Sequence, residues 1–148
     1  MSEMIIRPVR AADKPEWLRM RSALWKDARR EELADEMNKM LGDQTAPVFV
    51  AVRPDGRLGG FVEAGTRKYA DGCETGPVGY IEGWYVDADL RLQGIGAGLI
   101  HAAEQWARGL GLTEMGSDTW LDNETSIQAH LKLGFEEKER LVHFGKQL

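Results

Sequence analysis

The stretch from Val78 to Leu110 constrains the fold most, because it predicts a strand, a glycine-rich turn and a helix in immediate succession. The strand covers residues 78–86 and the turn residues 87–96. In the residues that follow, apolar side chains recur every three or four positions, so one face of the helix can pack on a sheet. These positions are Ile95, Leu99, Ala102, Ala103, Trp106 and Leu110.

Three glycines lie where this strand passes into the helix: Gly94, Gly96 and Gly98. The first amides of a helix lack an internal partner and the helix dipole is positive there, so an anion such as a pyrophosphate is favoured. Without a Cβ, the glycines allow a phosphate to approach the backbone. A tight turn with close helix–sheet packing is the alternative interpretation, because the chain has 17 glycines. The motif is neither a Walker A loop nor a dinucleotide fingerprint, whose third glycine is replaced by Leu99.

Length and composition predict one globular domain over residues 1–148, large enough for a hydrophobic core. The net charge of −5 disfavours nucleic acid as a partner and is compatible with a cationic one, although acidity for solubility also explains it. Cys73 is the only cysteine, so no intrachain disulfide can form, and no Cys/His cluster predicts a metal site. The N-terminus has no long apolar run; we therefore expect neither a signal peptide nor a membrane span, and a cytoplasmic location.

The rest of the chain alternates between predicted strands and helices. Asp13, Pro15 and Glu16 predict the start of the first helix, with a capping box between the two acids. Further helices are expected at residues 31–41 and 126–132. Strands are expected at residues 4–9, 47–52, 58–66 and 113–119, with a terminal hairpin at 135–140 and 141–146. An α/β fold follows, with a mixed sheet flanked by helices.

The block Arg91-x-x-Gly94-x-Gly96 resembles the acetyl-CoA loop of the GCN5-related N-acetyltransferases (GNAT). Asn123, followed by Leu133-Gly134-Phe135, resembles the closing helix of that family, and the likeness covers essentially the whole chain. It implies a mostly antiparallel sheet of about seven strands, splayed at its central strands, with about four helices. It also implies acetyl-CoA as co-substrate, with no metal, held by Trp84, Val86, Arg91, Gln93, Gly94, Ile95, Gly96, Ala97, Gly98 and Asn123.

Glu82 is a candidate for chemistry because it lies in the middle of an apolar strand, where a lone carboxylate is costly to bury. By the two-residue period of a strand, it shares a face with Tyr80, Trp84 and Val86. Gly83 beside it indicates a bulge. An exposed strand face is the alternative interpretation.

Asp118 follows the strand after the central helix, and open α/β sheets bind ligands at the carboxyl ends of strands. The alternative is an Asx-turn or capping residue. Many GNAT members carry a tyrosine three residues before the Leu-Gly-Phe leucine, where it protonates the leaving thiolate. This chain has His130 there, which leaves the general acid open between His130 and another group.

Several separated blocks resemble, more narrowly, the aminoglycoside 6′-N-acetyltransferases. They are Leu24-Trp25, Tyr69–Cys73, Ile81–Gly83, Glu114–Thr119 and Leu133–Glu137. In that group the residues matching Glu82 and Asp118 hold amino groups of the drug, and those matching Trp25 and Tyr69 line the pocket. The same resemblance implies a homodimer to which residues 135–148 contribute. A polycation rich in hydroxyls needs carboxylates and aromatic faces, which agrees with these residues.

The mechanism that we expect is direct acetyl transfer, with Glu82 accepting the proton of the amine, through water. No acetyl-enzyme is expected at Cys73, which lacks a histidine partner. Two other functions remain open: acetylation of a polyamine, amino acid or peptide N-terminus, and acetyl-CoA sensing without turnover.

Overall fold

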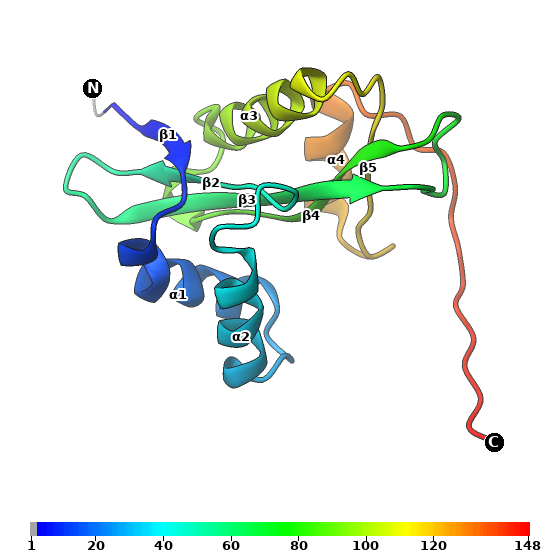
Figure 1. Cartoon of the computed structure of the whole chain (residues 1–148), viewed down its shortest axis with the longest axis horizontal. Coiled ribbons are helices and arrows are strands. Elements are labelled where there is room, and N and C mark those ends of the chain that lie inside the picture. The colour runs from blue at the N-terminus through cyan, green and yellow to red at the C-terminus, as the bar shows by residue number, and fades with distance from the viewer. Residues whose placement is uncertain (1–2) are drawn as a thin grey trace.

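A computed structural model describes residues 3–148 of the chain. It consists of a five-stranded sheet with helices on both faces (Figure 1). Helices α1 (Lys14–Leu24) and α2 (Arg30–Met40) lie on one face, and α3 (Ile95–Gly109) lies on the other. The fourth helix, α4 (Glu124–Lys132), follows the last strand. None of the helices within residues 3–148 is both long and apolar enough to cross a lipid bilayer.

The strands are ordered along the sheet as they are in the sequence: β1 (Ile5–Pro8), β2 (Val48–Val52), β3 (Leu58–Arg67), β4 (Val78–Val86) and β5 (Met115–Ser117). The first four pair antiparallel, and β5 runs parallel to β4. The predicted mixed sheet is therefore confirmed. Strand β5 pairs only with Gly79, Tyr80 and Ile81, so the second half of β4 diverges from it and the sheet splays as expected.

Each face of the sheet has its own hydrophobic core. On the α3 face, Leu99, Ile100 and Ala103 of the helix pack on Val62 and Ile81. On the other face, Trp17 and Met20 of α1 and Met37 of α2 pack with side chains of β2 and β3. The three- and four-residue spacing that predicted α3 thus marks the helix face that packs on the sheet.

A buried ion pair joins α1 to β3. The Arg21 guanidinium donates to both carboxylate oxygens of Glu63, at 2.7 and 3.1 Å, and the Trp17 indole N–H donates to the same carboxylate at 2.9 Å. The two charged side chains are only 3% and 4% exposed. Arg21 also donates to the Leu33 carbonyl, so one guanidinium ties α1 to both β3 and α2.

Two predictions about segment ends were wrong. The Asp13 carboxylate does not form a capping box with Glu16; it accepts from the Arg10 amide and pairs with Arg7 at 2.7 Å, while Glu16 pairs with Arg19. Both carboxylates therefore bind nearby arginines instead of forming the predicted capping box.

The terminal hairpin is also absent from the sheet, which has five strands rather than about seven. After α4 the chain runs from residue 135 to 148 without secondary structure, away from the body of the fold (Figure 1). Phe135 packs on the α3-face core and on His130, but the apolar Leu141, Val142 and Phe144 are exposed. The predicted hairpin at 135–140 and 141–146 was therefore wrong, because none of the strands within residues 3–148 lies beside this segment.

We expect Arg21→Met to lower the free energy of unfolding by about 3–5 kcal/mol, because it leaves the Glu63 carboxylate buried without its cation. Urea denaturation measures this. Arg57→Met is the control: it breaks an exposed pair with Glu16 and should cost at most about 1 kcal/mol. Equal losses in the two variants would contradict a special role for the buried pair.

Candidate active site

A β-bulge in β4 determines where Glu82 points. Glu63 of β3 pairs with Gly83, but the next residue, Ala64, pairs with Ile81, so Glu82 is an extra residue. Ile81 and Trp84 both belong to the α3-face core, whereas Glu82 lines a cleft beside Trp25 on the opposite face. The bulge that Gly83 indicated is confirmed, but the prediction that Glu82 shares a face with Trp84 and Val86 was wrong, because the extra residue interrupts the two-residue period.

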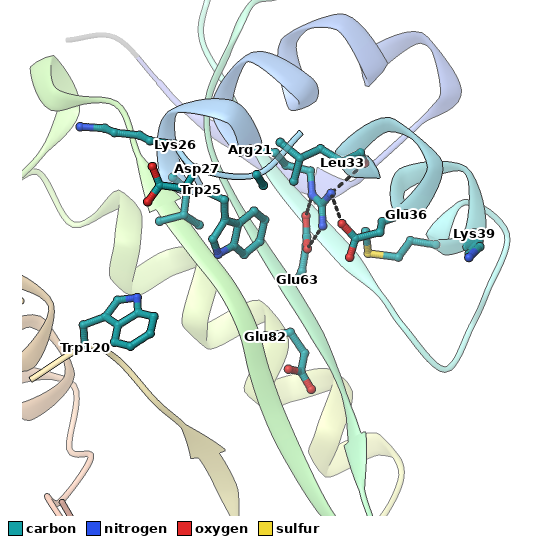
Figure 2. Close-up of a pocket in the computed structure, with 13 residues that line it drawn as sticks. Arg21, Trp25, Lys26, Asp27, Leu33, Glu36, Lys39, Glu63, Glu82 and Trp120 are labelled. Carbon is teal, nitrogen blue, oxygen red and sulfur yellow. Dashed lines mark hydrogen bonds and ion pairs between the residues drawn. The ribbon is translucent and has the colours of Figure 1, made fainter. Parts of the chain in front are cut away.

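The cleft lies between α1, α2 and the bulge and has a volume of about 700 Å³ (Figure 2). Trp25, the C-cap of α1, forms one wall, and Trp120, from the loop after β5, stands on the other side. The Trp25 ring reaches Gly83 so closely that a Cβ there would lie 2.6 Å from it. Gly83 thus makes room for an aromatic wall beside Glu82.

The cleft is lined by more charged side chains than the sequence had suggested. Arg21 and Glu63 neutralise each other, and Arg21 also lies 3.5 Å from Glu36; apart from Glu63, the carboxylates that line the cleft are Asp27, Glu36 and Glu82. Lys26 and Lys39 also line the cleft. Neither Asp27, Glu36 nor Trp120 was predicted. Only their charge or aromaticity could have drawn attention to them, and many surface residues share those features.

Glu82 and Asp118 are linked through Arg67 and Tyr80. Arg67 donates to both oxygens of Glu82, at 2.7 and 3.0 Å, and its guanidinium carbon lies 3.5 Å from the centre of the Tyr80 ring. The Tyr80 hydroxyl donates to Asp118 at 2.5 Å. The two predicted carboxylates are therefore brought to one site, together with a tyrosine and an arginine that sequence reasoning missed.

The hydroxyl of Tyr80 stays protonated at neutral pH. Burial raises the pKa of Tyr80 well above its ordinary value, and the hydrogen bond to Asp118 raises this pKa further, although the charge of Arg67 opposes the shift. The hydrogen bonds to Glu82 raise the pKa of the Arg67 guanidinium, and the charge of Asp118 adds to that shift. The cluster therefore holds two carboxylates, one guanidinium and a neutral tyrosine, with an overall charge of −1.

The glycine turn before α3 is open to solvent. Gly94 is the N-cap of α3 with φ of 80°, and Leu92 also has a positive φ, of 64°. A turn of this kind points successive amides into one concavity, which suits an anion. Gly94 has no side chain that could cap these amides, and no atom lies within 4 Å of where its Cβ would be.

The other residues predicted for the cofactor surround this turn. Gln93 donates to the Asp89 carbonyl at 3.1 Å, Ile95 is buried in the core and Ala97 is exposed. Arg91 donates to the Val86 carbonyl at 3.1 Å. Arg91 and Val86, predicted separately, are thus in direct contact.

Trp84 has a buried polar atom without a partner. Its indole N–H is shielded from solvent and makes no hydrogen bond with the part of the chain that the structure describes. The ring lies against the start of α3, where a Cβ on Gly96 would be 3.1 Å from it, and it meets the His130 ring edge to face. Because buried donors are nearly always paired, this atom indicates a place for an acceptor from a ligand.

His130 has both ring nitrogens engaged. Nδ1 lies 2.7 Å from the Ser126 carbonyl, which only accepts, so Nδ1 carries the proton. Nε2 lies 2.7 Å from the Ser117 hydroxyl, which can donate or accept. Both ring nitrogens are therefore engaged with Ser126 and Ser117, which hold the ring between β5 and α4 and favour a structural role for His130 over that of the general acid.

Neither Tyr69 nor Asn123 lines the cleft. Tyr69 is exposed, donates to Asp71 at 3.0 Å and does not line the cleft. Asn123 caps α4 by accepting from the Ser126 amide at 3.1 Å. Their roles in binding stay predictions. Within residues 3–148, no three His, Cys, Asp or Glu side chains come together as a metal site would require.

Comparison with known proteins gives consistent matches over the whole chain. The family model described as the acetyltransferase (GNAT) family matches residues 14–135. An aminoglycoside N(6′)-acetyltransferase type 1 of Klebsiella aerogenes is 44% identical over 150 aligned positions, covering 99% of each chain. One from Stenotrophomonas maltophilia is 38% identical over 97% of this chain and 93% of the relative.

Solved structures of the same kind of enzyme also match the fold of this chain. The crystal structure of the aminoglycoside 6′-N-acetyltransferase AAC(6′)-Ih from Acinetobacter baumannii superposes with a TM-score of 0.91 at 34% identity, covering 99% of both chains. AAC(6′)-Iy in complex with the bisubstrate analogue CoA-S-monomethyl-acetylneamine superposes with a TM-score of 0.92 at 32% identity, over 99% of this chain and all of that one.

Tyr80→Phe removes the donor to Asp118, and we expect it to lower the free energy of unfolding at neutral pH by about 1–3 kcal/mol. The folded pKa of Tyr80 is raised, so its stabilisation is complete below the unfolded pKa of about 10 and is lost as the pH rises toward the folded value. The difference between the two proteins should therefore narrow above about pH 10 in urea denaturation. Tyr69→Phe, at an exposed tyrosine, is the control for neutral pH. A difference that stays constant from about pH 7 to about pH 11 would contradict the account.

Proposed function

Because the chain belongs to the acetyltransferase (GNAT) family, we propose that it is an acetyl-CoA-dependent enzyme that acetylates the 6′-amino group of aminoglycosides and so inactivates them. The observation that supports this most is the cation site at the bulge, where Glu82, Asp118 and the face of Tyr80 surround a positive charge. The adjoining cleft adds Asp27, Glu36 and two tryptophan walls, which suits a polycation with sugar rings.

The turn before α3 fits acetyl-CoA as the co-substrate. The uncapped amides around Gly94 and the nearby Arg91 suit a pyrophosphate. The unpaired Trp84 N–H and the strand-free edge of β4 provide donors on the path from this turn to the bulge. The co-substrate supplies an acetyl thioester, and a relative is described as solved with CoA bound.

The chain's own residues then do three things. Glu82 and Asp118 bind and orient the acceptor amine on the α1/α2 side of β4, opposite the α3 side that receives the co-substrate. A primary amine is protonated at neutral pH, so it must lose a proton before it attacks, and Glu82 accepts this proton through water. Backbone donors of the splayed half of β4 stabilise the oxyanion as the amine adds to the carbonyl; the C–S bond then breaks and CoA leaves as the thiolate, which takes up a proton. The enzyme is proposed to act in the cytoplasm, as one domain over residues 1–148.

One acceptor panel tests the proposal against its rivals. Neomycin and paromomycin differ at the 6′ position, where neomycin has an amine and paromomycin a hydroxyl. We expect acetylation of neomycin but not of paromomycin, spermidine or a peptide N-terminus. Equal turnover of neomycin and paromomycin would place the reaction at another amine, and binding of acetyl-CoA without any turnover would favour a sensor.

Asp118→Asn keeps the shape of the side chain and an acceptor for Tyr80 but removes a charge. A hydrogen bond to a charged group contributes about 1.5–3 kcal/mol, so kcat/KM for neomycin should fall roughly tenfold or more. The KM for acetyl-CoA should hardly change. Asp55→Asn, in the turn between β2 and β3, is the control and should leave both values intact. Equal damage to both substrates would assign Asp118 a structural role instead.

We also propose a two-fold symmetric homodimer to which residues 135–148 contribute. This segment leaves the fold with apolar side chains exposed, Phe144 at 94%, and β5 lies at the edge of the sheet. Both features favour contact with a second copy. Sedimentation at micromolar concentration should give twice the chain mass of 16.6 kDa. A monomer would refute the dimer, and a dimer that persists after deletion of residues 141–148 would exclude this segment's part in it.

A further inference from the structure

We propose that Arg67 occupies the acceptor's ammonium position in the free protein and must be displaced by the acceptor, a cost that an acceptor with several charges can offset and a single amine cannot. The inference rests on the proposed function, because it assigns the Glu82 site to the acceptor amine. It adds a residue that sets the cost of acceptor binding and that binds no substrate itself.

The first support is that Arg67 uses the whole carboxylate of Glu82. Nη2 donates to Oε1 at 2.7 Å and Nε donates to Oε2 at 3.0 Å. An incoming ammonium needs the same oxygens, and a carboxylate paired through both of them offers it little net charge. Binding of the amine at Glu82 therefore requires the guanidinium to move or to share an oxygen.

The second support is that the rest of the site is already arranged around a cation. The guanidinium carbon lies 3.5 Å from the centre of the Tyr80 ring, within the distance of a cation–π contact. The Tyr80 hydroxyl donates to Asp118, which fixes a second carboxylate beside the same ring. Two carboxylates and an aromatic face form the kind of site that binds an ammonium group, and a cation of the chain itself fills it.

The third support is that the Arg67–Glu82 pair is much easier to break than the buried Arg21–Glu63 pair. The Arg67 and Glu82 side chains are 41% and 42% exposed, whereas Arg21 and Glu63 are 3% and 4% exposed. Half-exposed pairs in water contribute little to stability. Arg67 is also the last residue of β3, next to the loop 68–77, so its side chain can turn toward solvent without moving the core.

Displacement then favours acceptors that carry several charges. A single amine exchanges one cation for another at Glu82 and gains little. A polycation also reaches Asp27 and Glu36 in the same cleft, where Glu36 is 58% exposed although it lies 3.5 Å from Arg21, and these contacts offset the loss of the Arg67–Glu82 pair. Arg67 would thus lower the affinity for every amine, but a single amine has no further charge with which to compensate.

Arg67→Gln tests this, with neomycin as the polycation and 6-amino-6-deoxyglucose as the single amine. We expect KM to fall about two- to fivefold for both amines, the range set by a weak exposed pair, because both must break the same Arg67–Glu82 pair. Arg67→Lys keeps the charge and should stay close to the unmodified protein. The KM for acetyl-CoA should not change. Arg57→Gln removes an arginine that pairs with Glu16 outside the cleft, and should alter neither acceptor.

Each other outcome overturns the proposal. A rise in KM for both acceptors in Arg67→Gln would mean that Arg67 holds Glu82 in position. No change in KM would mean that the amine binds elsewhere. An equal fall in KM in Arg57→Gln would mean that the effect comes from the loss of any positive charge and not from the position of Arg67. Calorimetric binding of both amines to the same variants keeps the test valid without turnover: if the unmodified protein does not acetylate neomycin, the proposed function fails, while the binding constants still decide the role of Arg67.

Discussion

The extra residue in β4 is the constraint on which both sides of the site depend. Glu82 and Gly83 oppose a single position of β3. The alternation of side chains between the two faces of the sheet is therefore interrupted at the bulge. Glu82 points into the cleft with Trp25, and two residues later Trp84 packs against the start of α3. Gly83 allows this, since a Cβ would collide with the Trp25 ring. Because of this one bulge, the Glu82 carboxylate lies on one face of the sheet and the Trp84 indole on the other.

The Arg21–Glu63 and Arg67–Glu82 pairs have different physical roles. Arg21 and Glu63 are buried, tied to Trp17 and Leu33, and hold α1 and α2 against the sheet. Arg67 and Glu82 are half exposed and meet solvent at the bulge. Water competes with the second pair and not with the first, so the scaffold that supports the cleft is fixed while its charged surface can be rearranged by a ligand.

Much of the fold could be predicted from the sequence, because it follows from local patterns of residue types. The bounds of β4, the packing face of α3 and the glycine turn follow from apolar spacing and from residue types that need no partner to be recognised. The resemblance to the family added the splayed sheet and the placement of Glu82 and Asp118 at the same site. The bulge itself was suggested by Gly83.

Other features depend on contacts between distant residues, which no local pattern encodes. The face of Glu82 was mispredicted because a bulge changes the period of a strand. Arg67 lies 15 positions before its partner and looks like any strand-end arginine. The terminal hairpin was predicted from local residue types, but a strand forms only beside another strand, and residues 135–148 have no neighbouring strand within the described residues 3–148.

The most direct test of the central claim, that the amine binds at the bulge, is a crystal structure of the chain with CoA and neomycin. If the amine binds at the bulge, the 6′ nitrogen will lie at hydrogen-bond distance, about 3 Å, from a Glu82 oxygen, with the Arg67 guanidinium turned away. A 6′ nitrogen that lies elsewhere, with the Arg67–Glu82 pair intact, would contradict it.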